Sequence, residues 1–254
     1  VATIQNFLNL KNLELVDKTI KGVKTHSIGK GDYTGVYPIS LKSNLIKFIK
    51  LELNQIRKAL ILKKIAKELK LEQIAEKIFN GKVQLHMIDS YYSEKSEQNI
   101  IDWHCDMSGL FSQGKKYDLD DASIKFFFYM TDVQSANGCL AYIPYSHHVV
   151  KALTILIRDK KVEYKPHWKL EDLRKQISEN PTKKLIENSI GSNKLNTFLN
   201  STKFIEGEQK DTFDFDLQMK KGSVVIFDEF GVRRGSKPSK NNRLVLRFFY
   251  RKKK

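Results

Sequence analysis

The sequence predicts a mainly β protein with helical cover, in which an antiparallel sandwich or barrel has helices packed around it. Apolar residues repeat at helical spacing in the first third of the chain, and short runs rich in β-branched and aromatic residues follow. These runs do not alternate regularly with helices, as they do in βαβ proteins. The 254 residues are long enough for one domain with a substantial core.

The N-terminal part divides into turns and helices. Residues 1–40 contain three closely spaced glycines, so we expect a short edge element and loops there. Leucine and isoleucine then recur every three or four positions over residues 45–60, which places one apolar stripe along a helix that Ser43 can cap. Shorter helical repeats continue over residues 65–78 until Asn80-Gly81, where we expect the helical region to end.

The pattern becomes strand-like after Gly81. Six runs have the composition of strands: KVQLHMIDSYY, ASIKFFFYMTDV, CLAYIPYS, DTFDFDLQ, GSVVIFDEF and NRLVLRFFYR. Within them, Phe126–Phe128 and Phe248–Tyr250 are expected to alternate between the core and the outer face. Residues 149–200, which include Pro166 and Pro181, form a second helical or irregular stretch.

The composition is that of a folded protein. Hydrophobic residues make up 41% and charged residues 29%, which excludes disordered, collagen-like and disulfide-rich chains. Two cysteines, Cys105 and Cys139, cannot build a disulfide framework. No apolar run approaches the roughly 20 residues of a membrane span, and the start VATIQNFLNL lacks the basic residues of a signal peptide. We therefore expect a soluble cytoplasmic protein.

The positive charge is spread widely, whereas the arginines are concentrated. The formal net charge is +16, but lysines occur almost everywhere, which is unlike the clustered basic stripe of a nucleic-acid-binding protein. Five of the eight arginines lie in the last 22 residues, which indicates a local need for a planar, permanently charged group. Nucleic-acid binding is kept as an alternative because residues 65–79 faintly resemble a helix-turn-helix.

The segment Trp103-His104-Cys105-Asp106 carries the most specific chemistry. On an extended backbone His104 and Asp106 share one face, and Cys105 points to the other. An imidazole and a carboxylate side by side are two of the three ligands in a non-haem iron facial triad. Alone, this pattern is also met in surface loops, so its meaning depends on the rest of the chain.

Four segments, in order along the chain, resemble the phytanoyl-CoA dioxygenase family of Fe(II)/2-oxoglutarate oxygenases. The first carries the Trp-His-x-Asp metal motif. The second is a strand followed by a loop with Asn-Gly and by a Pro-x-Ser-His turn. The third is a strand with a turn that ends in Arg-Gly, and the fourth is a closing strand that contains arginine. The segments are Ile101–Asp106, Ser123–His148, Lys220–Ser239 and Asn241–Arg251. Tyr145 stands where the turn usually has glycine.

The resemblance implies a double-stranded β-helix, a cupin-like jelly roll, and a set of site residues. It implies that His104 and Asp106 are catalytic iron ligands and that Arg243 binds the distal carboxylate of 2-oxoglutarate. Arg247, four residues further along the same strand, is the second candidate for that role, and Ser236 is a candidate hydrogen-bond donor to the same carboxylate. Fe(II) and 2-oxoglutarate are the implied cofactor and cosubstrate.

The chain departs from the family at the third iron ligand. Where a histidine is expected, this sequence has Arg233, or Arg234 if the turn is aligned one residue later; the spacing to Arg243 favours Arg233. A guanidinium stays protonated and offers no lone pair to a metal. Its charge also repels a divalent cation.

Three explanations remain open for the arginine at the ligand position. Arg233 can swing away, so that iron is held by fewer protein ligands. Another side chain can substitute. The candidates for this are His86, His147, His148 and Glu229. Arg233 can also replace the metal and pair with Asp106 in a pocket that binds an anion. The hypothesis that Arg233 or Arg234 pairs with Asp106 is directly testable in a structure.

The sequence therefore predicts one oxygenase-like domain that uses Fe(II) and 2-oxoglutarate to oxidise a small organic substrate. Residues 1–82 are expected to form a strand and helical layer, and residues 83–251 a jelly-roll core with an insert at 149–210. Substrate contacts are expected from residues 108–121 and from the insert, and the positive charge is compatible with an anionic substrate. The alternatives are a catalytically degenerate member that binds an anion without iron, and a nucleic-acid-binding protein.

Overall fold

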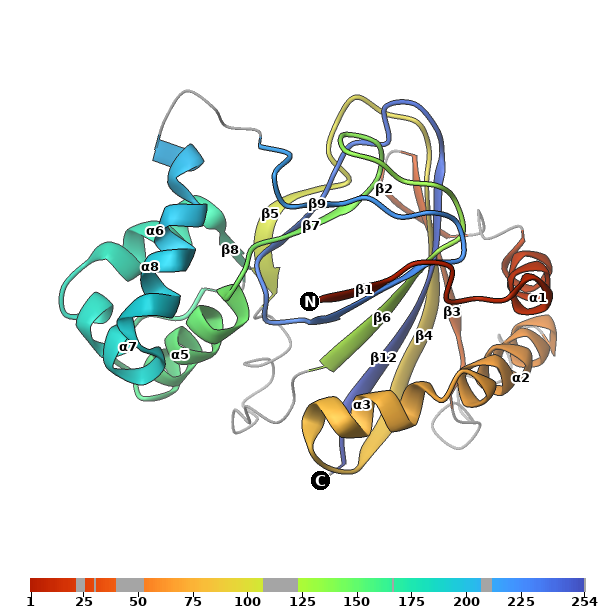
Figure 1. The fold of residues 1–254 in the computed structure, drawn as a ribbon, viewed down its shortest axis with the longest axis horizontal. Coiled ribbons are helices and arrows are strands. Elements are labelled where there is room, and N and C mark those ends of the chain that lie inside the picture. The colour runs from red at the N-terminus through yellow and green to blue at the C-terminus, as the bar shows by residue number, and fades with distance from the viewer. Residues whose placement is uncertain are drawn as a thin grey trace.

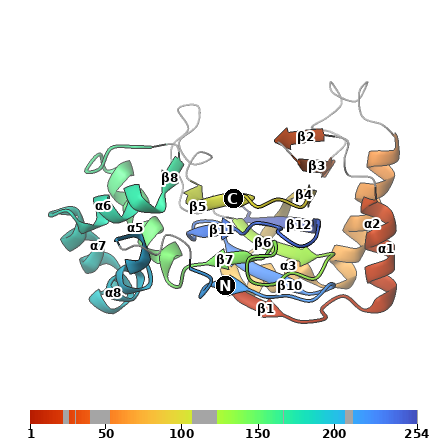
Figure 2. The same ribbon diagram turned by 90° about the horizontal axis from the view of Figure 1, so that it is seen from above.

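The computed structural model describes residues 1–21, 26–29, 31–39, 53–106, 123–165, 167–206 and 212–253, without the side chains of residues 26–29, 53, 106 and 167. Two antiparallel sheets lie in the middle of the molecule, with a group of helices at each end (Figures 1 and 2). A layer of buried side chains from both sheets joins them.

The larger sheet has seven described strands, and the C-terminal strand lies at its centre. In spatial order they are β1 (Ala2–Ile4), β10 (Val224–Asp228), β6 (Ser123–Tyr129), β12 (Arg243–Lys252), β4 (Val83–Ser93), β3 (Asp32–Tyr37) and β2 (His26–Gly29). Every neighbouring pair is antiparallel. Strand β12 pairs with β4 on one side and β6 on the other, so Arg247 is flanked by Asp89 and Phe127, whereas Arg243 lies at the start of the strand, opposite Ser93 of β4.

The smaller sheet has five described strands. In spatial order they are β8 (His167–Lys169), β5 (Ile101–Asp106), β11 (Arg233–Gly235), β7 (Leu140–Tyr142) and β9 (Asp216–Leu217). In the register of β11 and β5, Arg233 lies directly opposite His104. Two residues 129 positions apart in the sequence are thereby placed side by side.

Helices cover the outer sides of both sheets. Three of them, α1 (Leu10–Ile20), α2 (Leu53–Glu68) and α3 (Leu71–Phe79), share a buried apolar cluster with the seven-stranded sheet. At the opposite end lie α5 (Ser146–Arg158), α6 (Leu170–Ser178), α7 (Thr182–Ile190), α8 (Ser192–Ser201) and the 3-10 helix η5 (Lys203–Glu206) (Figure 1). This second group packs against the five-stranded sheet.

Strand β6 is buried on both faces. Phe126 and Phe128 point to the helix-covered side, whereas Phe127 and Tyr129 point toward the smaller sheet. The alternation predicted for this aromatic run is present, but its second face is also interior because another sheet covers it. This explains why the run contains so few polar residues.

The predicted strands and the second helical stretch are confirmed. Each of the six strand-like runs contains a strand, and residues 149–200 are largely helical. Helix α3 ends at Phe79, and the capping residue Asn80 adopts a left-handed conformation with φ 47°. The predicted Ser43 cap and residues 45–52 lie outside the described residues. Helices α2 and α3, which resembled a helix-turn-helix, bury their apolar sides against the sheet.

The prediction of only loops and an edge element in residues 1–40 was wrong. Helix α1 lies there, begins after Asn9, whose side chain accepts a hydrogen bond from the Asn12 amide, and buries Val16 and Ile20. Isolated helices of this length are marginal in water, and α1 is stabilised by its contacts with the sheet cluster. None of the helices in the described part of the chain has the length and apolarity needed to cross a membrane.

Candidate active site

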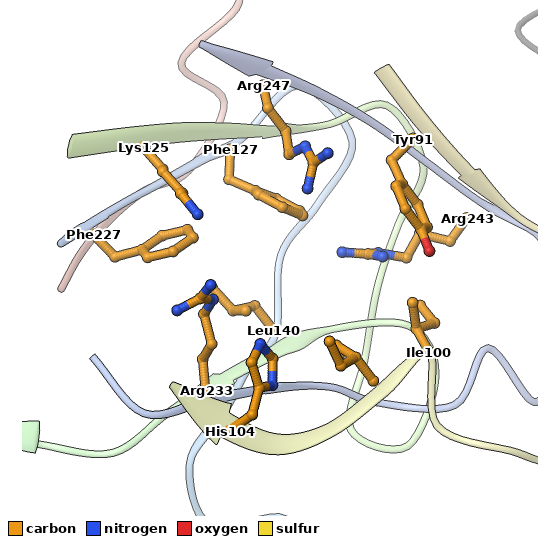
Figure 3. A pocket seen from close by; sticks show the side chains of 12 residues that line it. Tyr91, Ile100, His104, Lys125, Phe127, Leu140, Phe227, Arg233, Arg243 and Arg247 are labelled. Carbon is orange, nitrogen blue, oxygen red and sulfur yellow. The ribbon is translucent and has the colours of Figure 1, made fainter. Parts of the chain in front are cut away.

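A cavity of about 190 Å³ lies between the two sheets. Side chains from both sheets point into it (Figure 3). It is lined by Tyr91, Ile100, Ile101, His104, Lys125, Phe127, Leu140, Phe227, Arg233, Gly235, Arg243 and Arg247. The structure thus brings together four of the residues singled out in the sequence, namely His104, Arg233, Arg243 and Arg247.

Arg243 enters the cavity from the start of β12. Only 4% of the residue is exposed, and its guanidinium lies over the rings of Phe127 and Tyr129, at 5.0 and 5.8 Å from their centroids. No acidic side chain pairs with it among the described residues, and its Nε has no hydrogen-bond partner there. A buried cation in this state is costly unless an anion binds to it.

The Asn137-Gly138 turn packs directly against Arg243. Asn137 is buried, and its side-chain oxygen accepts hydrogen bonds from the amides of Lys240 and Asn241, which fixes the chain just before β12. Gly138 has φ +78°, and a Cβ at this position would lie 3.0 Å from Arg243 Cδ. The glycine therefore provides both the left-handed turn and the space that the arginine stem occupies.

We expect Gly138→Ala to lower the free energy of unfolding by about 1–2 kcal/mol, because alanine is strained at positive φ, and to weaken anion binding by displacing Arg243. Gly191→Ala is the matched control, since Gly191 has φ +86° and a Cβ at this position would have no atom within 4 Å. Urea unfolding and calorimetric titration with 2-oxoglutarate measure the two effects. Equal affinities in the two variants contradict the link to Arg243.

The other two cations from the larger sheet have acidic partners. Arg247 forms a bidentate pair with Asp89, its register partner on β4, with N–O distances of 2.7 and 2.6 Å. Lys125 Nζ lies 3.6 Å from Glu229, which also accepts a hydrogen bond from the Ser123 amide. Glu229, a candidate substitute ligand in the sequence, is therefore engaged with Lys125.

His104 enters the cavity from the smaller sheet. The residue is 3% exposed, and its Nδ1 lies 2.6 Å from the carbonyl oxygen of Asp102. Because a carbonyl can only accept, Nδ1 carries a proton, and in the neutral form of the ring the lone pair is then on Nε2. This tautomer suits a metal ligand, whose second nitrogen commonly donates to a carbonyl. The side chain of Asp106 lies outside the described residues, and so does the predicted pair between Asp106 and an arginine.

Arg233 lies next to His104 and is held by the turn that precedes β11. Its Nη1 donates to the carbonyl oxygens of Glu229 and Gly231, at 2.7 and 3.2 Å, and the residue is 7% exposed. A Cβ on Gly231 would lie 1.9 Å from the Tyr142 hydroxyl, so the turn requires glycine there. The guanidinium is therefore anchored by backbone groups beside the histidine.

Arg234 points away from this cavity and has a structural partner. Its Nη2 lies 2.9 Å from Asp216, and both side chains are almost completely buried. Its guanidinium also lies over the ring of Trp103, 4.9 Å from the centroid. Of the two arginines at the expected ligand position, only Arg233 lines the cavity.

Ser236 and Cys139 form a buried pair outside the cavity lining. The Ser236 hydroxyl donates to the Cys139 carbonyl at 3.0 Å and lies 3.2 Å from the Cys139 sulfur. Burial raises the pKa of the Cys139 thiol to about 12, so it stays protonated at neutral pH. In this structure Ser236 therefore stabilises the strand pair, and the cysteine has no nucleophilic form.

The two other candidate histidines of the turn lie at the start of α5. The rings of His147 and His148 are 4.1 Å apart, and Ser146 ties this turn to β11 by accepting from the Val232 amide. Tyr145 adopts φ 58°, a left-handed conformation that explains the preference of this turn for glycine. The remaining candidate, His86, is exposed on β4. None of the three lines the cavity.

We expect the protein to lose stability between about pH 6.5 and pH 4 because of His147. Burial, and then the neighbouring His148, lower the pKa of His147 to about 4. As the pH falls, the histidine therefore takes up its proton in the unfolded chain at a higher pH than in the folded chain. The stabilisation that comes from neutral His147 is complete above pH 6.5 and is lost on acidification. After allowance for solvent screening it amounts to about 1–2 kcal/mol. Urea unfolding at pH 7 and 4.5 measures it, and His147→Gln should reduce the difference.

The residues that the structure describes do not by themselves form a complete iron site. No three His, Cys, Asp or Glu side chains gather as a metal-binding group in the part of the chain that the structure describes. His104 has the tautomer of a ligand, but its register partner is Arg233, which cannot bind a metal. The donor set therefore departs from a facial triad at one position.

Comparison with solved structures defines the class of fold. HygX from Streptomyces hygroscopicus with nickel and 2-oxoglutarate bound has a TM-score of 0.56 at 14% identity, covering 99% of this chain and 82% of HygX. The epimerase SnoN in complex with Fe3+, alpha ketoglutarate and nogalamycin RO also has a TM-score of 0.56, at 11% identity, covering 99% and 78%. The fold is thus the double-stranded β-helix of the non-haem 2-oxoglutarate oxygenases, as predicted.

The sequence itself identifies the family. The profile of the phytanoyl-CoA dioxygenase (PhyH) family matches residues 43–229, almost three quarters of the chain, and the protein belongs to that family. The resemblance based on four segments is thereby confirmed. A comparison with curated protein sequences finds no match.

Several residues of the cavity were not predicted from the sequence. Lys125 and Phe127 come from β6, Tyr91 from β4 and Phe227 from β10. The sequence predicts part of their position, because strand alternation places each side chain on one of the two faces of its strand. Which face meets the second sheet depends on the order of the strands, which the sequence pattern does not give. Leu140 and Ile100 have no sequence signal of their own.

Proposed function

We propose that this protein is an oxygenase-type enzyme of the Fe(II)/2-oxoglutarate class, which binds 2-oxoglutarate between its sheets and oxidises a small organic molecule. Arg243 carries the proposal. Its buried guanidinium faces the cavity with no acidic partner among the described side chains. A carboxylate can accept two parallel hydrogen bonds from a guanidinium, and its negative charge then compensates the positive charge of the arginine.

The surroundings of Arg243 support the binding of a carboxylate. Phe127 and Tyr129 keep water from one side of the guanidinium, which strengthens its interaction with an anion. Arg247 is less suited to the same role, because Asp89 already occupies its guanidinium with two hydrogen bonds. Ser236 donates its hydroxyl to a backbone carbonyl and does not face the cavity.

The substrate class follows from the family and the cavity. HygX has been crystallised with hygromycin B and SnoN with nogalamycin RO, both small organic molecules. The cavity of this protein combines apolar residues (Ile100, Leu140 and Phe227) with cationic groups. We therefore propose a small substrate that has an apolar body and an anionic group.

The need for iron distinguishes two candidate functions, an iron-dependent enzyme and a member of the family that binds an anion without iron. Iron supplies the oxygen chemistry of the class, and in this chain His104 and Asp106 are the proposed ligands. Arg233 in the third position favours the second candidate function, a catalytically degenerate member that binds an anion without iron. The observation behind it is the anchored guanidinium beside His104.

An anaerobic titration with Fe(II) and 2-oxoglutarate distinguishes the two candidates. For the enzyme we expect a visible metal-to-ligand charge-transfer band that saturates near one iron per chain. Arg233→His, which restores the family ligand set, serves as the positive control. Absence of the band in the natural protein and its presence in Arg233→His contradict the enzyme and support the degenerate member.

A further inference from the structure

A second cavity, of about 270 Å³, lies where helix α2 ends and helix α3 begins. It is on the face of the larger sheet that the N-terminal helices cover, where α3 packs on β4 and β12 (Figure 1). The described residues that line it are all different from those that line the active-site cavity. A cavity needs only about 10–15 Å³ to hold one water molecule, so this one has room for a small organic ligand.

Tyr250 forms the floor of this second cavity and carries an unused hydrogen-bonding group. The residue is 3% exposed, and it lies opposite Leu85 of β4, which also lines the cavity. Its hydroxyl has no hydrogen-bond partner among the described residues. Burial, and then the charge of Glu72, raise the pKa of Tyr250, so the hydroxyl keeps its proton at neutral pH. A buried hydroxyl without a partner is costly, which favours a ligand that supplies an acceptor oxygen.

The start of α3 supplies further hydrogen-bond donors to the same cavity. The first amides of a helix have no partner within the helix, and the capping residue Lys70 has no acceptor in its side chain. Lys70 adopts φ 56°, a left-handed conformation, between the two helices. Because Lys70 and Glu72 both line the cavity, the N-terminal end of α3 lies at its edge, where the helix dipole favours a negative charge.

The charges around the cavity are mostly positive. Three lysines line it against one glutamate, Glu72, which gives a net charge of +2. Lys63 donates to the carbonyl oxygen of Ile39, which leaves its charge in place, and Lys67 and Lys70 are exposed. None of these three lysines forms an ion pair with an acidic side chain in the part of the chain that the structure describes. The lining therefore attracts an anion.

We propose that this cavity binds the phosphate monoester group of a small molecule, with Tyr250, Lys67, Lys70 and the first amides of α3 as donors. Such a group carries a charge of about −1.5 to −2 at pH 7 and three acceptor oxygens, which match the charge and the donors of the cavity. A terminal phosphate can reach the buried hydroxyl, whereas a phosphodiester of a nucleic acid is flanked by chain on both sides. This favours a small molecule over the DNA that the helix-turn-helix resemblance of residues 65–79 suggests.

Calorimetric titration of the natural protein with glycerol 3-phosphate tests the proposal. We expect saturable binding, and about 10- to 100-fold weaker binding in Tyr250→Phe, the effect of losing one hydrogen bond to a charged group. Tyr145→Phe, which removes an exposed hydroxyl outside the cavity, is the matched control and should leave the affinity unchanged. Because the Tyr250 hydroxyl has no partner in the protein without ligand, the Tm of Tyr250→Phe should equal or exceed that of the natural protein. Thermal unfolding thus separates a loss of binding from a loss of folding.

Charge variants at the start of α3 test the second part of the site. Lys70→Gln should weaken binding of glycerol 3-phosphate by about 2- to 5-fold. Lys77→Gln, in the last turn of the same helix and outside the lining, should not change it. Glu72→Gln should strengthen binding, because it removes a competing negative charge. Equal affinities of Tyr250→Phe and the natural protein, or absence of binding at about 10 mM, overturn the site.

Two further ligands distinguish the possible sources of the phosphate. Dimethyl phosphate, a diester with one charge, should bind at least about 10-fold more weakly than glycerol 3-phosphate. Binding of a short DNA duplex that is lost in Tyr250→Phe and in Lys70→Gln overturns the small-molecule ligand in favour of nucleic acid. The affinity of Tyr250→Phe for 2-oxoglutarate should be that of the natural protein, because Arg243 faces the other cavity. Failure of the phosphate site therefore leaves the proposed function intact.

Discussion

Replacing Arg243 with methionine should abolish detectable 2-oxoglutarate binding and make the protein without ligand more stable. The loss of a bidentate contact to a carboxylate weakens binding at least about 100-fold, equivalent to about 2.7 kcal/mol. The same change removes a cation that is only 4% exposed and has no acidic partner among the described residues. We expect the free energy of unfolding to rise by about 1–3 kcal/mol.

Calorimetry with 2-oxoglutarate and thermal unfolding without it measure these two opposite changes. A rise of about 2–4 °C in Tm per kcal/mol is expected for a protein of this size. Arg158→Met serves as control, because its guanidinium is exposed and pairs with the neighbouring Asp159. A variant that is less stable and still binds 2-oxoglutarate contradicts the proposed role, because Arg243 is then a structural residue.

Replacing Asp216 with alanine should destabilise the protein by about 3–5 kcal/mol, because Arg234 is then left buried without this partner. Asp216 also accepts hydrogen bonds from the Ser135 hydroxyl and the Ala136 amide. It therefore joins β9 and the 131–138 loop to β11. We expect Tm to fall by about 10 °C or more, measured by thermal unfolding.

Two further variants make this second prediction specific. Asp214→Ala removes an exposed carboxylate two residues away and should change stability by less than about 0.5 kcal/mol. The double variant Arg234→Met with Asp216→Leu removes both charges and should recover part of the loss, since the arginine already packs on Trp103. Equal stability of Asp216→Ala and Asp214→Ala contradicts the importance of the buried pair.

The strands and the family could be predicted from the sequence, because both depend on local pattern. Runs such as the one around Phe126–Phe128 have strand composition along their whole length, and the spacing between Arg233 and Arg243 fits the family motif. Helix α1 was missed because its apolar stripe is short and close to a glycine-rich segment. It is stabilised by packing against a sheet whose strands come from distant parts of the chain.

The order of the motifs also brought His104, Arg233 and Arg243 to attention before any geometry was known. Chemistry alone then established that an arginine cannot serve as a metal ligand. Neither pattern nor chemistry distinguishes an arginine that binds a ligand from one that forms an ion pair, because that depends on neighbours that are remote in sequence. Four of the five arginines in the last two strands illustrate this difference, namely Arg233, Arg234, Arg243 and Arg247.

The tertiary structure decided where each of these arginines lies and which described residues it contacts. Arg247 meets Asp89 across the sheet and Arg234 meets Asp216. Arg233, which donates to the carbonyls of Glu229 and Gly231, lines the cavity together with Arg243. These assignments follow from strand register, which places residues more than 100 positions apart opposite each other. The sequence by itself determined the fold class, the family and the absence of a histidine at the third ligand position. Only the folded chain determined which charges are compensated, because compensation depends on distances between separate strands.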